Sequence, residues 1–283
     1  MSKKSVLITG CSSGIGAALA RECHRQGYAV IATARDPARL DSLRELGISC
    51  YRLDVNCQKD LEALLTVLEE KGQSIDFLIN NAGFGTMAAM ADLCPDDLEA
   101  QFRTNVFSIL RVTNAVVPGM IERRSGRIIN IGSVSGILTS PFAGAYCASK
   151  AAVHSLSEAY RMELAPFGVG VMTVQPGAIA SSFGDNASAV TEDLIREDSV
   201  YKPIESAIRR RAQASQERPT AAEEFARILC RHMKSDHPPA VVRIGNGSRL
   251  LPLLARLLPD RLLDLVRSKP FQLNDLNNGS TVG

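Results

Sequence analysis

TGCSSGIG, residues 9–16, places three glycines between a short apolar run and a segment of helical period. Glycine permits a tight turn and lets backbone N–H groups approach a bound anion closely. At the start of a helix, the unpaired N–H groups and the helix dipole favour a phosphate group. The same triplet also occurs in plain strand-to-helix turns, so the surrounding pattern must decide. Here a strand pattern resumes at Tyr28, which is the context that a dinucleotide-binding turn requires.

Outside this turn, short β-branched apolar runs alternate with longer segments of helical period along most of the chain. The runs predict strands at 6–9, 28–34, 48–53, 75–80, 127–131, 169–174 and 241–244. The segments between them predict helices at 14–26, 37–46, 59–71, 95–121, 145–166 and 221–233. Such alternation predicts an α/β fold, in which one parallel sheet of seven strands carries helices on both faces.

Two regions interrupt the alternation. Residues 178–220 form a long insertion after the sixth predicted strand, and residues 249–283 form a tail after the last one. Neither region has the pattern of a separate domain. We therefore expect a single domain over residues 1–248, with the insertion inside it and the tail packed on it.

The tail is rich in leucine and contains Pro252 and Pro259. Proline restricts helix continuation, so short helices are expected rather than one membrane span. Four arginines flank the apolar clusters, at positions 249, 256, 261 and 267. We expect the tail to close the substrate pocket or to pack on the body. The alternatives are a subunit interface and peripheral contact with a membrane surface.

Composition narrows the class of protein. The 283 residues are 45% hydrophobic and 22% charged, which is typical of a soluble globular protein. The net charge of +2 is too small to favour nucleic acid as a partner. Seven cysteines include no Cys-x-x-Cys pair and no cluster with histidine, which favours a cytoplasmic location and no catalytic metal. The apolar run after Lys4 is too short for a signal peptide or a transmembrane segment.

YCASK, residues 146–150, places Tyr146 and Lys150 on one face of a predicted helix. A half-buried tyrosine and a snorkelling lysine on an amphipathic helix would give the same pattern. Chemistry offers a sharper explanation, because reducing a carbonyl requires a proton for the oxygen as hydride reaches the carbon. A free tyrosine has a pKa of about 10, and a nearby ammonium would lower it towards the working pH. The pair then predicts a tuned general acid/base.

Further motifs follow in a consistent order. They are Leu53-Asp54-Val55 and Asn80-Asn81-Ala82-Gly83 at the ends of the third and fourth strands, Asn105 in TNVF, Ser133 thirteen residues before Tyr146, and Pro176-Gly177 after the sixth strand. With the T-G-x-x-x-G-x-G turn they span roughly residues 5–245, and together they resemble the short-chain dehydrogenase/reductase family. The resemblance implies a Rossmann-type doubly wound fold and an oxidoreductase acting on a ketone, aldehyde or alcohol. It also implies a homodimer or homotetramer that pairs through helices 95–121 and 145–166.

The resemblance also assigns roles to individual residues. Ser133 would hydrogen-bond the substrate oxygen, Lys150 would also hold the nicotinamide ribose, and Asn105 would bind a water through its backbone in a proton relay. Ser135 is an alternative to Ser133, although turn chemistry explains it equally. Ser108 stands where relatives often have glycine. The cofactor-binding residues would be Gly10, Ser12, Ser13, Gly14, Ile15, Gly16, Arg35, Asp54, Val55, Asn81, Ala82, Gly83, Tyr146, Lys150, Pro176, Gly177, Ile179 and Ser181.

The end of the second strand indicates which dinucleotide is used. NAD-specific relatives place an acid there, which accepts hydrogen bonds from the ribose 2′-hydroxyl. Here the position is Ala34, and Arg35 follows with a fork of donors suited to a 2′-phosphate, to which Ser12 could add a hydroxyl. Asp36 would oppose this if the strand ended later, but Asp36-Pro37 also reads as a helix start. The pattern favours NADP(H) over NAD(H).

In this family the insertion forms a substrate lid. Seven apolar residues of the insertion could line an apolar pocket, or could merely pack the lid onto the body: Phe183, Val190, Leu194, Ile195, Val200, Tyr201 and Ile204. Three residues from the loop before helix 145–166 could form the opposite wall of the pocket: Leu138, Phe142 and Ala143. An apolar pocket suggests a steroid, a retinoid or an acyl compound. TGCSSGIG, ATARDP and the tail most resemble the hydroxysteroid and retinol dehydrogenase branch.

Other residues receive structural interpretations. Cys147 should pack, the histidines at 24, 154, 232 and 237 should lie on the surface or on helix faces, and residues 209–211 should form a solvated arginine face. Two other functions are alternatives to an oxidoreductase. A catalytically silent dinucleotide-binding regulator would usually lose Tyr146 or Lys150. A sugar-nucleotide epimerase or dehydratase would need a larger C-terminal domain than this tail provides.

Overall fold

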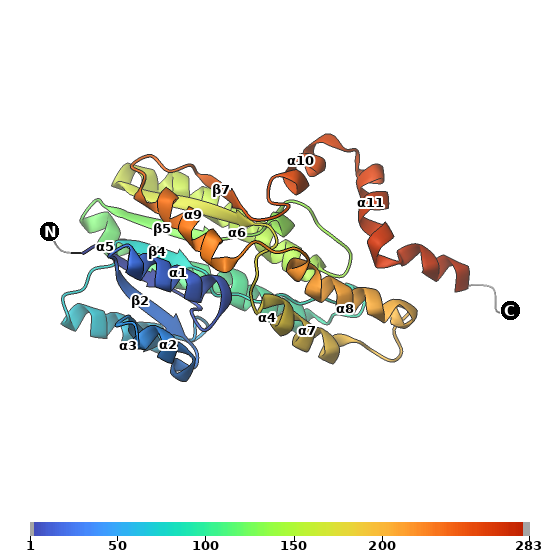
Figure 1. Cartoon of the computed structure of the whole chain (residues 1–283), viewed down its shortest axis with the longest axis horizontal. Coiled ribbons are helices and arrows are strands. Elements are labelled where there is room, and N and C mark those ends of the chain that lie inside the picture. Colours follow the sequence, from blue (N-terminus) through green and yellow to red (C-terminus); the bar gives the residue numbers. More distant parts are fainter. Residues whose placement is uncertain (1–2, 280–283) are drawn as a thin grey trace.

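The computed structural model describes residues 3–279 and contains one parallel sheet in the strand order β3-β2-β1-β4-β5-β6-β7 (Figure 1). The strands are β1 Ser5–Ile8, β2 Ala29–Ala34, β3 Ser49–Arg52, β4 Phe77–Asn80, β5 Gly126–Ile131, β6 Val169–Pro176 and β7 Val241–Ile244. Every neighbouring pair is parallel. The predicted seven-stranded Rossmann-type sheet is therefore confirmed, with each strand displaced from its predicted bounds by no more than two residues.

Alternating side chains of the strands fill two apolar layers. In β1, Val6 and Ile8 belong to one layer and Leu7 to the other, and all three are fully buried. Because helices cover both faces of a parallel sheet, its strands read as continuous apolar runs rather than alternating ones. The first layer packs under α1 Gly14–Arg25, α2 Asp41–Arg44 and α9 Ala222–Lys234. The second packs under α3 Gln58–Glu70, α5 Ser108–Glu122 and α6 Gly144–Leu164.

Two predicted helices differ in detail. Instead of one helix over 95–121, α4 Pro95–Phe102 and α5 are joined by a π-helical turn, Arg103–Phe107. Such wide turns often occur at functional sites, and this one contains Asn105. Instead of one helix over 37–46, a 3-10 turn, Pro37–Leu40, precedes the short α2. Asp36 caps that turn by accepting a hydrogen bond from Ala38 N at 3.0 Å, as predicted.

The insertion and the tail lie beyond the carboxyl ends of the strands (Figure 1). The insertion forms two helices that sequence analysis did not predict, α7 Phe183–Leu194 and α8 Glu205–Gln213. The chain winds outwards in both directions from β1 and β4, so a crevice is expected between the carboxyl ends of these two strands. The insertion and the tail add walls to that end of the sheet.

The tail forms α10 Leu250–Leu257 and α11 Asp260–Ser268, so the prediction of short helices is confirmed for the described part, while residues 280–283 lie outside it. Pro259 separates the two helices. Pro252, which we expected to interrupt a helix, does not do so. It lies in the first turn of α10, where no backbone N–H is required. None of the described helices is long and apolar enough to cross a membrane.

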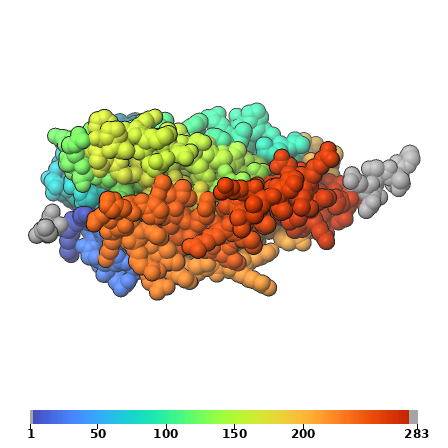
Figure 2. Space-filling view, turned by 90° about the horizontal axis from the view of Figure 1, so that it is seen from above, coloured from blue at the N-terminus to red at the C-terminus, as the bar shows by residue number. Residues whose placement is uncertain are grey.

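Specific contacts hold the tail against the body (Figure 2). Arg267 donates to the Thr139 carbonyl at 2.8 Å, and Arg210 of α8 donates to the Pro270 carbonyl at 2.5 Å. Phe271 packs edge-on against Phe142, with 6.1 Å between the ring centroids. The tail also lines a cavity of the molecule, through Leu250, Leu251 and Phe271. These contacts favour closure of the cavity or packing as the role of the tail.

Deletion of residues 247–283 should lower the thermal unfolding temperature or raise the Michaelis constant for an apolar substrate, because Phe271 leaves an aromatic cluster and the cavity loses a wall. Calorimetry and steady-state kinetics measure these effects. Leu265→Ala is the control, since this tail side chain is 64% exposed and should change neither. Robust binding of the intact protein to lipid vesicles, lost on deletion, would instead identify the tail as a membrane contact.

Candidate active site

A cavity of about 910 Å³ lies where the turns after the strands meet. Among the predicted site residues, it is lined by Gly10, Ser12, Ser13, Gly14, Ile15, Gly16, Arg35, Asp54, Val55, Asn81, Ala82, Gly83, Ser133, Tyr146, Lys150, Pro176, Gly177, Ile179 and Ser181. Asn105 is the one predicted site residue outside the lining. Residues scattered over the sequence thus come together because parallel strands all end at the same edge.

The glycine turn after β1 leaves no room for side chains. Gly10 has φ +73°, and a Cβ there would stand 2.9 Å from Ala82 Cα. A Cβ on Gly16 would collide with the carbonyl oxygen of Gly10. The first turn of α1, whose N–H groups have no partner within the helix, borders the cavity through Gly14, Ile15 and Gly16. This geometry fits a pyrophosphate, as the sequence predicts.

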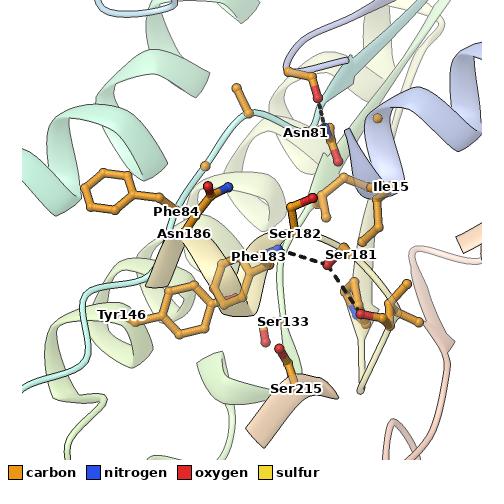
Figure 3. Close-up of a pocket in the computed structure, with 18 of the residues that line it drawn as sticks. Ile15, Asn81, Phe84, Ser133, Tyr146, Ser181, Ser182, Phe183, Asn186 and Ser215 are labelled. Atoms are coloured by element: carbon orange, nitrogen blue, oxygen red, sulfur yellow. Dashed lines mark hydrogen bonds between the residues drawn. The ribbon is translucent and has the colours of Figure 1, made fainter. Parts of the chain in front are cut away.

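The end of β4 braces that turn. Thr9 Oγ1 accepts hydrogen bonds from the backbone N–H groups of Asn81 and Ala82, both at 3.0 Å. The Asn81 amide donates to the carbonyls of Thr9 and Gly10, at 2.9 and 3.1 Å (Figure 3). The Asn81 side chain is therefore engaged in holding the glycine turn, so its predicted contact with the cofactor would involve its backbone.

Tyr146 and Lys150 both lie buried in the cavity wall, as their spacing predicts. Lys150 Nζ donates to the Ile131 carbonyl at 2.8 Å and stands 5.9 Å from the centroid of the Tyr146 ring. Phe183 of α7 packs on the same ring, with 5.3 Å between centroids (Figure 3). The phenol is thus held between α6 and the insertion.

Burial changes the acidity of both groups. It lowers the pKa of Lys150 to about 8 and raises the pKa of Tyr146 to about 12, although a hydrogen bond from Ser133 and the Arg211 charge pull the tyrosine value down. The predicted lowering of the Tyr146 pKa is therefore wrong, because desolvation of the phenolate outweighs its charged neighbours. At neutral pH Tyr146 carries its proton, which is the form required of an acid.

Ser133 opens a 3-10 turn, Val134–Gly136, and its hydroxyl accepts a hydrogen bond from Ser135 N at 3.1 Å. Ser135 thus lies in this turn and also lines the cavity, so the choice between its turn role and a role like that of Ser133 stays a prediction. His154 lies on the face of α6, as predicted, where its half-buried imidazole accepts a hydrogen bond from Ser133 N at 3.4 Å. Burial lowers the pKa of His154 to about 4, and the neutral imidazole that results can act as an acceptor.

Asn105 lies buried beneath the cavity floor. Its amide pairs with the backbone of Phe84, accepting from N at 3.1 Å and donating to O at 3.0 Å, and it also donates to Ser149 Oγ at 3.0 Å. The side chain therefore ties the loop after β4 to the residue that precedes Lys150. A backbone-bound water at Asn105 stays a prediction.

The end of β2 carries the predicted cofactor determinant. Arg35 is exposed directly after Ala34 and lines the cavity. Arg39, which sequence analysis missed, lines it as well and lies one turn further along. At the end of β2 the lining therefore offers two guanidinium groups and no carboxylate. Asp36 does not line the cavity and caps its own turn instead.

The apolar wall is only partly as predicted. Phe183 and Val190 line the cavity, but Leu194, Ile195, Val200, Tyr201, Ile204, Leu138, Phe142 and Ala143 do not. Phe142, Tyr201 and Ile204 instead pack in a separate cluster with apolar side chains of α8. Cys147 packs in a buried cluster, as predicted. The apolar lining that was missed includes Phe84, Met87, Ala189, Leu250, Leu251 and Phe271.

The three arginines of α8 do not form one solvated face. Arg209 pairs with Glu192 and Glu205 on the surface, and Arg210 is exposed and bonds to the tail. Arg211 lines the cavity instead, and its Nε donates to Ser140 Oγ at 2.8 Å. Successive helical residues are about 100° apart, so the third of three arginines faces away from the first. The prediction of a solvated face is wrong for Arg211.

Comparison with known proteins agrees with this geometry. The family model for short chain dehydrogenases matches residues 4–191. The chain is 32% identical over 266 residues to the uncharacterized oxidoreductase YbbO of Escherichia coli, covering 93% of this chain and 94% of that one. It is 37% identical over 209 residues to an NADPH-dependent 1-acyldihydroxyacetone phosphate reductase of Schizosaccharomyces pombe, covering 73% and 70%.

Solved structures show the same architecture. A short-chain dehydrogenase from Streptomyces avermitilis is 29% identical, matches with a TM-score of 0.77 and is covered over the whole of both chains. A short-chain dehydrogenase/reductase from Burkholderia phymatum in complex with NAD is 26% identical, with a TM-score of 0.78 and coverage of 94% and 95%. The parallel sheet with its covering helices thus has counterparts in a known group of oxidoreductases.

Proposed function

Because the chain belongs to the short-chain dehydrogenase/reductase family, we propose that it transfers hydride between NADP(H) and the carbonyl or alcohol carbon of an apolar substrate. The observation that carries this proposal is the buried pair of Tyr146 and Lys150, which opens onto the same cavity as the glycine turn. A catalytically silent dinucleotide-binding regulator is the alternative. It would have no use for a buried ammonium beside a buried phenol, both of which cost free energy to desolvate.

The chain's own residues would bind, orient and move one proton. The backbone of the glycine turn would hold the pyrophosphate. The dinucleotide, when bound, supplies or accepts the hydride. Ser133 would hydrogen-bond the substrate oxygen, and Tyr146 would donate its phenolic proton to that oxygen during reduction. Lys150 would hold the nicotinamide ribose and stabilise the phenolate that remains, and Asn105 would connect Lys150 to solvent through a water on its backbone.

The preference for NADP(H) rests on Arg35, to which Arg39 adds a second guanidinium. A guanidinium binds a phosphate through paired charge-assisted hydrogen bonds. The S. pombe relative is named as an NADPH-dependent reductase, which supports the preference for NADP(H). The B. phymatum protein was solved with NAD, so family membership alone does not decide the cofactor.

The substrate proposal rests on the apolar lining, which includes Phe183, Val190, Leu250 and Phe271. A steroid, a retinoid or an acyl compound would fit such a wall, and the name of the S. pombe relative supports the acyl compound among the three. The hydroxysteroid and retinol dehydrogenase branch stays a prediction. In this proposal residues 178–220 act as the substrate lid.

We also propose a cytoplasmic homodimer or homotetramer. All seven cysteines are free thiols, in keeping with a reducing compartment. The helices through which relatives pair carry exposed apolar side chains, among them Leu110 of α5 and Met162 of α6, which are 43% and 60% exposed. A second copy would cover these side chains.

Tyr146→Phe should lower turnover by at least roughly a hundredfold while dinucleotide binding is retained, because the ring stays and only the transferable proton is lost. Turnover of a ketone panel with NADPH, followed at the nicotinamide absorbance, measures the first effect, and titration of nucleotide fluorescence measures the second. Tyr160→Phe is the matched control on the same helix, since the Tyr160 hydroxyl bonds to Asn114 outside the cavity. Near-normal turnover by Tyr146→Phe would refute the assignment.

Arg35→Ala should raise the Michaelis constant for NADPH and leave that for NADH nearly unchanged, because only NADPH carries the 2′-phosphate. Steady-state kinetics with both cofactors test this. Arg44→Ala removes an exposed arginine of α2 that does not line the cavity, and should alter neither constant. A wild type that prefers NADH, or an equal loss for both cofactors in Arg35→Ala, would show that the end of β2 does not select the phosphate.

A further inference from the structure

Arg211 is a cation in the cavity wall without an acidic partner. Its neighbour on α8, Arg209, pairs with Glu192 at 2.8 Å and with Glu205 at 3.1 Å. Among the side chains that the structure describes, those of residues 3–276, the Arg211 guanidinium forms a single hydrogen bond, from Nε to the neutral hydroxyl of Ser140 at 2.8 Å. No carboxylate of those residues forms an ion pair with it. The guanidinium therefore has donors left over, and it has the cavity beside it.

The surroundings of Arg211 work against its charge. Burial lowers the pKa of Arg211, and the opposing influences come from Cys147 and Tyr146, not from any acid. Arginine nevertheless stays protonated in proteins, because its ordinary pKa exceeds about 12. A charge held in a poorly solvated place costs free energy unless an opposite charge or hydrogen-bond acceptors meet it. One neutral hydroxyl meets only one of its five N–H groups.

From this unpaired guanidinium we propose that Arg211 binds an anionic oxygen group of the substrate, a phosphate monoester or a carboxylate. The inference rests on the proposed carbonyl chemistry of the same cavity and narrows its substrate class. Arginine suits either anion, because its planar fork donates two parallel hydrogen bonds to a pair of oxygens. The substrate would then be an apolar carbonyl or alcohol compound with an acidic group.

The lining offers a place for each part of such a molecule. Tyr146 and Ser133 are placed to receive the carbonyl. Arg211 is close enough to Tyr146 to lower the pKa of its phenol. Phe183, Leu250 and Phe271 provide apolar surface for a hydrocarbon chain. The anion would thus be bound near the reacting carbon rather than at the distant end of the chain.

Two structural roles compete with this proposal. Arg211 could merely anchor the loop that carries Ser140, or it could merely tune the Tyr146 proton. Both roles would affect neutral and anionic substrates alike. An anion site affects anionic ligands alone, so the comparison of matched anionic and neutral ligands separates the proposed site from both structural roles.

The test uses the full chain loaded with NADPH and ligands of equal chain length. Binding of decyl phosphate, decanoate and decanol is measured by calorimetry. Turnover is measured with 1-decanoyl-dihydroxyacetone phosphate and with its phosphate-free counterpart. Wild type should bind at least one of the two anions more tightly than the alcohol, and the stronger of the two identifies the preferred anion. Arg211→Gln should lower the affinity for that anion by about 10-fold to 100-fold, which is the usual range for a hydrogen bond to a charged group. The affinity of this variant for decanol should stay that of the wild type.

Matched variants complete the experiment. Arg209→Gln removes the same charge from the same helix at an exposed ion pair and should preserve the selectivity for the anion. Ser140→Ala removes the anchor alone and should also preserve it. If Arg211→Gln does not fold, Arg211→Lys keeps the charge without the fork and should bind the anion at an intermediate strength.

Equal binding of decyl phosphate, decanoate and decanol by the wild type would overturn the proposal. So would equal losses for charged and neutral ligands in Arg211→Gln, or loss of selectivity in Ser140→Ala. Selective anion binding that disappears in Arg211→Gln without turnover of either ketone would support the anion site and refute the proposed reaction instead.

Discussion

The hydroxyl of Thr9 is the constraint on which the site depends, because it joins the ends of β1 and β4, the two strands between which the chain reverses its winding. By accepting the N–H groups of Asn81 and Ala82, it brings the loop after β4 within reach of the glycine turn. The absence of a side chain on Gly10 then permits this close approach, since a Cβ there would press on Ala82. The crevice that results is where dinucleotides bind in open parallel sheets.

A second set of buried polar groups extends from this crevice to the reacting residues. Asn105 joins the Phe84 backbone to Ser149, the Ser149 hydroxyl donates to the Tyr146 carbonyl at 2.7 Å, and Lys150 donates to the Ile131 carbonyl. Each bond satisfies a group that would otherwise be costly to bury. The start of α6 is thereby held between the loops after β4 and β5, so the phenol has a defined position. Such bracing is what a residue that transfers a proton requires.

The sheet and the glycine turn could be predicted from sequence because they follow from local patterns: apolar runs, glycines that allow positive φ, and the four-residue spacing of Tyr146 and Lys150. The faces of α7 and α8 could not, because their orientation depends on packing against distant elements, and Arg211 was therefore taken for a surface residue. The pKa of Tyr146 was predicted in the wrong direction because sequence reveals a neighbouring lysine but not the extent of burial.

The central claim is that a buried phenol gives up its proton beside a buried ammonium. The pH dependence of kcat/KM for reduction of a neutral ketone by NADPH tests it most directly, because this ratio reports the ionisations of the free protein. Burial lowers the pKa of Lys150 to about 8 and raises that of Tyr146 to about 12, so Lys150 loses its proton first as the pH rises. The account predicts a plateau at neutral pH and a decline above about pH 8. A profile that stays flat, or rises, between about pH 6 and about pH 10 would contradict it.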